Sequence, residues 1–187
     1  MKKLLIAAAL ACAPLATFAA DHYTLDPHHT FARFALSHFG FSTFHGQFNA
    51  TSGTATLDLA KKGGGVDVSI DVRSIATGVD KLDAHLLGAD FFDAAKYPTI
   101  TFKSNDFAFD GDQLASVTGA LTMHGVTRPI TLTVAHFVCK DHPISRSPAC
   151  GADLRATLKR SDWGVSGYVP AIGDEVTLSI EVEATKQ

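Results

Sequence analysis

The chain has 187 residues, of which 46% are hydrophobic and 19% charged, which excludes a disordered tail and a collagen-like repeat. Its 16 basic and 19 acidic side chains leave a formal net charge of −3, so there is no electrostatic footprint for a nucleic-acid backbone. The length favours a single domain that can bury a substantial core. We therefore expect one folded domain without a DNA or RNA partner.

Residues 1–19 differ in character from the rest of the chain. Lys2 and Lys3 precede an apolar run from Leu4 to Leu15, and small residues follow close behind. This pattern is typical of a secretory signal peptide, and the run is shorter than the roughly 20 residues that span a bilayer. The sequence predicts a signal peptide over residues 1–19, cleaved after Ala19 or Ala20. It also predicts export to the periplasm and a mature domain of residues 20–187.

Two of the three cysteines remain after this cleavage, Cys139 and Cys150. An even pair in an exported protein favours a disulfide. The ten residues between them are polar and include Pro143 and Pro148, which is typical of a hairpin tip. We expect a structural bridge that staples this hairpin.

The strongest pattern in the mature chain is an alternation of apolar and polar residues with a period of two. Val66, Val68 and Ile70, for example, alternate with polar side chains, as expected for a half-buried strand. The same alternation recurs over residues 55–59, 117–123, 130–138, 154–158 and 176–182. Short segments rich in glycine and aspartate separate the runs, so neighbouring strands should be antiparallel.

One segment follows a helical period instead. Val79, Leu82 and Leu86 recur at helical spacing, with acidic residues in the first turn. The spacing predicts a single short helix, followed by an irregular stretch over residues 90–93. No linker or repeat divides the chain.

About eight antiparallel strands can bury their apolar faces in a sandwich or in a closed barrel. The periodicity alone does not choose between these folds. A barrel of this size is either filled by its own side chains or holds one small ligand. Small residues at expected inward positions would leave room: Ala32, Ala55, Val117, Gly119 and Ala156.

Several local motifs, taken in order, resemble the YceI-like family of exported bacterial proteins, often described as lipid- or polyisoprenoid-binding. The motifs are residues 23–26, 29–40, 46–48, 74–78, 85–93, 96–104, 119–129 and 160–164. Together they cover nearly the whole mature chain. The chain departs from the family pattern in having Thr30 where serine is usual, and its Cys139–Cys150 hairpin is not part of that pattern.

The resemblance implies a fold and a site. The implied fold is all-β, a lipocalin-like antiparallel barrel of about eight strands with one short inserted helix. The implied site is an elongated apolar pocket for a long-chain amphiphile. Parity along the first long strand places Phe34 and Leu36 on one face and Arg33 on the other. The residues expected to line the pocket are Phe34, Leu36, His38, Phe48, Phe91, Phe92, Phe102, Leu121, Leu132 and Trp163.

Four polar residues within these motifs have two interpretations: His29, His38, Asp90 and Arg160. Each can satisfy buried backbone groups, because buried polar atoms require partners. Alternatively, they orient a polar head group at one end of the pocket. The helix and residues 90–93 are a candidate lid.

Nine histidines raise the question of a metal site. His28 and His29 are adjacent, so on a strand their side chains would point to opposite faces, and we expect no metal site inside the protein. A chain that starts at Ala20 would present an amine and the third-position imidazole of His22 to Cu(II) or Ni(II). No cofactor is expected.

These observations favour an exported protein that sequesters or carries a polyisoprenoid, fatty amide or fatty acid and is not an enzyme. No nucleophile–base pair or phosphate-binding loop is evident. The alternatives are a stress-linked periplasmic protein with a filled barrel, and a metal-binding N-terminus. Contact with a membrane and a homodimer are compatible with this interpretation.

Overall fold

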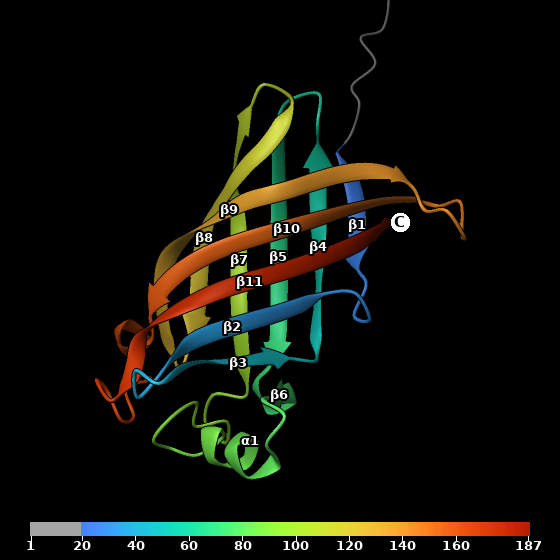
Figure 1. Ribbon diagram of the computed structural model, residues 1–187. Helices are drawn as coiled ribbons and strands as arrows, with labels where there is room; N and C mark the ends of the chain where they lie inside the picture. The colour runs from blue at the N-terminus through green and yellow to red at the C-terminus, as the bar shows by residue number, and fades with distance from the viewer. Residues whose placement is uncertain (1–19) are drawn as a thin grey trace, which may run out of the picture.

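The computed structural model describes residues 20–187, and the predicted signal peptide lies outside this part of the chain. Its strands are β1 (Asp21–Leu25), β2 (Phe31–His38), β3 (Ser42–Phe48), β4 (Thr51–Asp58), β5 (Gly63–Asp71), β6 (Ile75–Ala76), β7 (Thr99–Asp110), β8 (Gln113–Met123), β9 (Val126–Asp141), β10 (Pro148–Lys159) and β11 (Ile172–Lys186). They pair in antiparallel fashion around one axis, and β1 returns to pair with β11 (Figure 1). The sheet is therefore closed.

The barrel has eight strand positions, three of which are each filled by two short segments. β1 and β2 follow one another along the same edge of β11, where Leu25 pairs with Ala184 and Phe31 pairs with Glu181. β3 and β4 fill the next position, and β5 and β6 fill the third. The prediction of a closed barrel of about eight strands with one helix is confirmed.

One α-helix occurs among residues 20–187, inserted between β6 and β7 at the lower end of the barrel (Figure 1). α1 spans Asp80–Leu86, as the apolar spacing predicted. The Asp83 carboxylate accepts a hydrogen bond from the Thr77 amide at 2.8 Å, which ties the helix to the segment after β6. Two 3₁₀ turns, η1 (Val72–Ser74) and η2 (Arg160–Trp163), follow β5 and β10. No helix in this part of the chain is long and apolar enough to cross a membrane.

The predicted alternation holds along most strands, with two corrections. In β9, Val134 pairs with Leu154 whereas His136 pairs with Asp153, so the strand contains one extra residue. This bulge reverses the parity: Phe137 packs against the core and His136 is exposed. The second correction concerns Leu59, which lies beyond the end of β4 and is 46% exposed.

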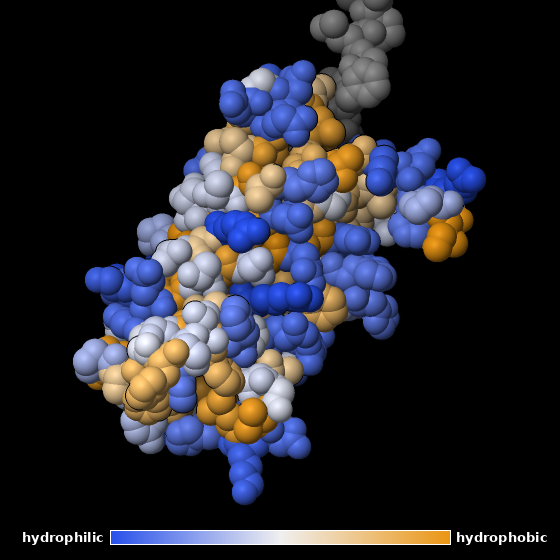
Figure 2. Space-filling model, in the orientation of Figure 1, coloured by the Kyte–Doolittle hydropathy of each residue, from blue (hydrophilic) through white to orange (hydrophobic). Residues whose placement is uncertain are grey.

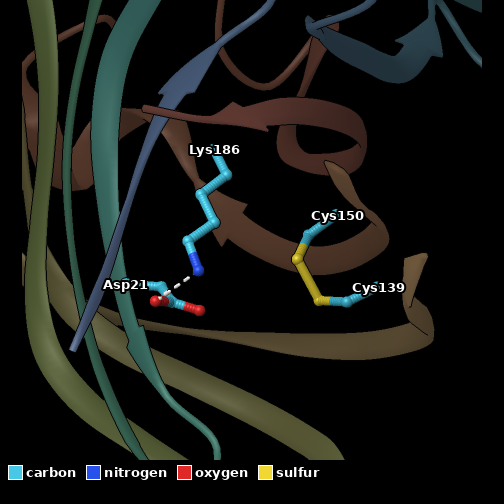
Figure 3. Close-up of a disulfide and its surroundings, with 4 residues drawn as sticks. All are labelled: Asp21, Cys139, Cys150 and Lys186. Carbon is cyan, nitrogen blue, oxygen red and sulfur yellow. Dashed lines mark ion pairs between the residues drawn. A yellow bond between two sulfur atoms is a disulfide. The ribbon is translucent and has the colours of Figure 1, made fainter. Parts of the chain in front are cut away.

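Cys139 and Cys150 form a disulfide between directly opposed positions of β9 and β10. Figure 3 shows this bridge together with the ion pair between Asp21 and Lys186, whose Oδ1 and Nζ atoms are 2.7 Å apart. Cys150 packs with buried residues of β1 and β11. The disulfide therefore lies where the first and last strands of the barrel meet.

Candidate functional site

The barrel encloses a cavity of about 480 Å³ whose wall is almost entirely apolar. Inward-facing residues of the long strands supply much of this wall, among them Val117, Leu132 and Leu178. Leu178 and Ile180 pack against buried residues of the core but are only half-buried, because they also face the internal space. The interior is therefore lined by side chains without being filled by them.

Two phenylalanine rings of the wall lie close to glycines of neighbouring strands. Gly46 is the cross-strand partner of Phe34, and a Cβ atom at Gly46 would lie 2.3 Å from the Phe34 ring. A Cβ atom at Gly119 would lie 2.6 Å from the ring of Phe102. Side chains at these glycines would displace the rings. The two glycines thus let the rings lie against the sheet, which helps to keep the lumen open.

The mouth of the cavity is marked by the exposed residues of its wall. These four residues are His38, Phe39, His85 and Tyr168, and all other wall residues are buried or half-buried. They come from the end of β2, the β2–β3 turn, α1 and the loop between η2 and β11. Because these segments all lie at the α1 end of the barrel, the cavity opens there (Figure 1).

Aromatic residues pack around this mouth. Phe91 and Phe92, from the segment after α1, both line the cavity. The ring of Phe92 lies edge-on to that of Phe48, with centroids 5.6 Å apart. The ring of Phe91 lies 5.0 Å from His85 and 5.9 Å from Tyr168. The α1 end is thus partly covered by packed rings from four segments: β3, α1, the segment after α1 and the loop before β11.

Arg160, at the start of η2, is a buried cation at the edge of the cavity, with 5% of its surface exposed. Its guanidinium donates hydrogen bonds of 2.9–3.0 Å to four backbone carbonyls, those of Val165, Gly167, Ile172 and Gly173. Burial lowers the pKa of this guanidinium from its ordinary value. These bonds hold the loop that carries Tyr168. Of the two interpretations of Arg160, the structure shows the one in which it satisfies backbone groups.

Asp174 holds the other side of the same loop. Its carboxylate accepts hydrogen bonds from the backbone amide of Ser161 at 2.9 Å and from the Ser161 hydroxyl at 2.8 Å. The hydrogen bond from the Ser161 backbone amide is the main reason that the pKa of Asp174 lies below its ordinary value. The turn η2 and the start of β11 are therefore joined by both a buried cation and a carboxylate.

The structure places nine of the ten predicted pocket residues on the cavity wall: Phe34, Leu36, His38, Phe48, Phe91, Phe92, Phe102, Leu121 and Leu132. Trp163 is the exception. It is buried in the core behind the wall, and its indole Nε1 donates to the Leu121 carbonyl at 3.1 Å. Because a buried indole N–H requires an acceptor, Trp163 packs against the sheet instead of facing the lumen.

Two of the remaining polar candidates, His29 and Asp90, lie outside the cavity. His29 is exposed, and its Nδ1 atom lies 2.8 Å from a carboxylate oxygen of Asp26 in the turn between β1 and β2. This hydrogen bond raises the pKa of His29. Asp90 is also exposed and is not part of the wall. Only His38, at the mouth, is placed where it could meet a head group.

The sequence did not indicate three of the wall residues that matter most here. Tyr168 lies in a loop without periodicity, and His85 lies on a helix too short to show which of its faces is covered. Phe137 reaches the wall only because of the bulge in β9.

No group of three metal-binding side chains is found among residues 20–187. Asp21 and His22, which the copper hypothesis requires, belong to β1 and pair with Leu57 and Thr56 of β4. That hypothesis also depends on the start of the mature chain, so it stays a prediction.

An eight-stranded antiparallel barrel with an apolar cavity open at one end places the protein among the lipocalin-like barrels. The model of the YceI-like domain matches residues 23–184. The chain therefore belongs to the YceI-like family. Protein YceI of Escherichia coli O6:H1 is 36% identical over 172 residues, which cover 90% of this chain and 88% of that protein.

Two solved structures show the same fold. The crystal structure of Burkholderia cenocepacia BcnA has a TM-score of 0.75 and 26% identity, covering 86% of this chain and 99% of that one. A domain from Saccharophagus degradans, described as a polyisoprenoid binding domain, has a TM-score of 0.65 and 20% identity, covering 88% and 98%. At that identity the second likeness concerns the fold alone.

Proposed function

We propose that the protein is an exported, periplasmic barrel that sequesters or carries a long-chain amphiphile, such as a polyisoprenoid, fatty amide or fatty acid, without catalysing a reaction. The observation that carries this proposal is the apolar cavity of about 480 Å³ with its mouth at the α1 end. A hydrocarbon chain offers only dispersion and desolvation to its binder, so an apolar wall is the surface that fits it.

Burial of the hydrocarbon chain supplies the main favourable contribution to binding. Each buried methylene contributes about 0.8 kcal/mol, so ten of them contribute about 8 kcal/mol before the costs of association. His38, His85 and Tyr168 stand at the mouth and would meet the polar head. The chain would enter first and the head would remain near solvent.

Two further observations support parts of the proposal. The disulfide between Cys139 and Cys150 is of the kind that persists in oxidising compartments, which supports export. The polyisoprenoid binding domain of Saccharophagus degradans has the same fold, which supports the ligand class only as far as fold resemblance extends.

Extraction of the purified protein with organic solvent, followed by mass spectrometry, tests for a bound lipid. Uptake of a long-chain polyprenol and of a long-chain fatty acid, each added from ethanol, then measures capacity. We expect a co-purifying lipid or saturable uptake of one probe. A protein that yields no lipid and takes up neither probe would instead be the filled-barrel alternative, and the proposal would be wrong.

A pair of alanine substitutions ties uptake to the cavity. In Gly46→Ala, the three atoms nearest the new Cβ are all ring atoms of Phe34, so this ring, which lines the cavity, must shift. In Gly63→Ala, the new Cβ meets nothing within 4 Å. We expect uptake about tenfold weaker in Gly46→Ala and unchanged in Gly63→Ala, with both variants folded by circular dichroism. Equal uptake by the two variants would place the ligand elsewhere.

A further inference from the structure

Large apolar side chains are exposed around the mouth of the cavity. Phe41 is 91% exposed, Tyr168 60%, Phe39 53% and Val169 36%. We call these four residues, three of which are aromatic, the aromatic rim. The backbone amide of Phe39 donates to the carbonyl of Ala171 at 3.1 Å, so the β2–β3 turn and the loop before β11 are neighbours. Figure 2 shows hydrophobic surface at this lower end of the molecule.

Two residues of the aromatic rim adopt backbone conformations that disfavour them. Phe39 has φ 54° and Tyr168 has φ 59°, in the left-handed region where glycine or asparagine is usual. Phe39 and Gly40 form the centre of a tight turn in which the amide of Phe41 donates to the His38 carbonyl at 3.0 Å. Such a turn strongly prefers Asn-Gly. An aromatic ring held there at a conformational cost, and left in solvent, indicates a role outside the fold.

The aromatic rim is continuous with the cavity. Phe39 and Tyr168 are at once exposed to solvent and part of the cavity wall. An apolar path thus runs from the outer surface into the lumen. A long-chain amphiphile resides in a bilayer, and moving it through water would expose every methylene at about 0.8 kcal/mol each. A mouth placed against the bilayer avoids that exposure. Tyrosine also suits the boundary between hydrocarbon and water.

We propose that the aromatic rim docks onto a lipid bilayer surface, so that the cavity exchanges its ligand directly with the membrane. This inference rests on the proposed function. The rim side chains would insert among the acyl chains, and His38 and His85, also exposed at the mouth, would lie at the level of the head groups. The occupant of this surface is thus a membrane, not a second protein.

Phe41 allows docking to be tested apart from binding, because it belongs to the rim but not to the cavity wall. Ile144, 88% exposed in the loop between β9 and β10, is a matched control outside the rim. Phe41→Ser, Ile144→Ser and the unmodified protein are mixed with phosphatidylglycerol–phosphatidylcholine vesicles that contain a long-chain polyprenol. Co-sedimentation with the vesicles and the rate of polyprenol transfer to the protein are measured. Uptake of the same polyprenol from ethanol is measured in parallel.

We expect co-sedimentation and vesicle transfer to fall about tenfold or more in Phe41→Ser, the loss of one inserted phenylalanine, and to stay unchanged in Ile144→Ser. Uptake from ethanol should be equal in all three proteins.

Equal vesicle transfer by all three would overturn the docking proposal, as would a defect of Phe41→Ser that also appears with ethanol. Sedimentation velocity showing a dimer that Phe41→Ser dissociates, without vesicle binding, would overturn it in favour of a second copy. Vesicle binding without uptake by any route would instead overturn the proposed function and leave the docking intact.

Discussion

The two ends of the barrel are built on different principles. At the end where β1 begins and β11 ends, Tyr23, Leu57 and Ala184 are buried together, and the disulfide joins β9 to β10 beside them. At the α1 end, Phe39, Phe41 and Tyr168 stand in solvent, and two of them adopt unfavourable backbone conformations. Both ends pack apolar residues, and Ile144 is exposed in the loop beside the disulfide. The large exposed aromatic side chains, however, all lie at the α1 end.

This difference indicates which end is specialised for function. Local strain and exposed aromatic surface each cost free energy and persist only where the rest of the structure supports them. At the α1 end that support is polar: Arg160 and Asp174 anchor the loop that carries Tyr168. At the other end, the supporting contacts are the buried apolar cluster around Tyr23 and the disulfide between Cys139 and Cys150. Perturbing each kind of support should therefore have a distinct result.

The largest effect is expected from Arg160→Gln. Four backbone carbonyls lose a charged donor, and carbonyls that remain buried without a partner cost about 1–3 kcal/mol each. Because part of the loop can rehydrate, we expect the free energy of unfolding in urea to fall by about 3–5 kcal/mol. The matched control is Arg33→Gln, which removes an exposed ion pair with Glu181 and should cost less than about 1 kcal/mol. Similar losses for the two variants would contradict the role assigned to Arg160.

The double variant Cys139→Ala, Cys150→Ala tests the support at the opposite end. The bridge closes a loop with a sequence separation of 11 residues, so its loss should lower the free energy of unfolding by about 2–3 kcal/mol. Polyprenol uptake from ethanol should change less than twofold, because alanine keeps the cavity wall apolar at Cys150 and the mouth lies at the far end of the barrel. A large loss of uptake, at a temperature where the variant is fully folded, would show that the two ends are coupled.

Asp174→Asn should have a smaller effect that depends on pH. The pKa of Asp174 is lowered in the folded protein, chiefly by the amide of Ser161, so the carboxylate stabilises the fold above its unfolded pKa. This contribution is lost as the pH falls through the folded value. We expect a deficit of about 1 kcal/mol at neutral pH, discounted for solvent exposure. The deficit should shrink below about pH 4, near the unfolded pKa. Urea unfolding of both proteins at a series of pH values measures this difference in the free energy of unfolding. A difference that stays constant with pH would contradict the role assigned to the Asp174 carboxylate.

Most of the barrel could be predicted from the sequence because burial imposes a period of two on each strand. The alternation over residues 66–72 and 176–182 was sufficient to place strands there. It failed at Ala135, because a bulge is defined by the pairing between two strands and leaves no mark on the pattern of one. The choice of a barrel over a sandwich came only from the family resemblance.

The residues of the candidate site likewise include some that could be predicted from the sequence and some that could not. Phe34, Leu121 and Leu132 could be placed on the wall from parity within their strands. Trp163 could not, because its position depends on the hydrogen bond to the Leu121 carbonyl across the sheet. Tyr168 was missed because its position depends on the bonds of Arg160 to the surrounding loop. Residues set by local periodicity were predictable, and residues set by long-range polar contacts were not.

Phe39→Asn addresses the contrast between the two ends most directly, although its expected effect on stability is the smallest. Asparagine tolerates a positive φ better than phenylalanine and suits the turn before Gly40. The substitution also removes the contact between the Phe39 and His38 rings, whose centroids are 4.6 Å apart. We expect a net gain of roughly 0.5 kcal/mol in the free energy of unfolding. Vesicle transfer should fall in the same variant. A residue whose replacement improves the fold while it impairs exchange with the membrane is maintained for the exchange, and a loss of stability in Phe39→Asn would show instead that the ring serves the fold.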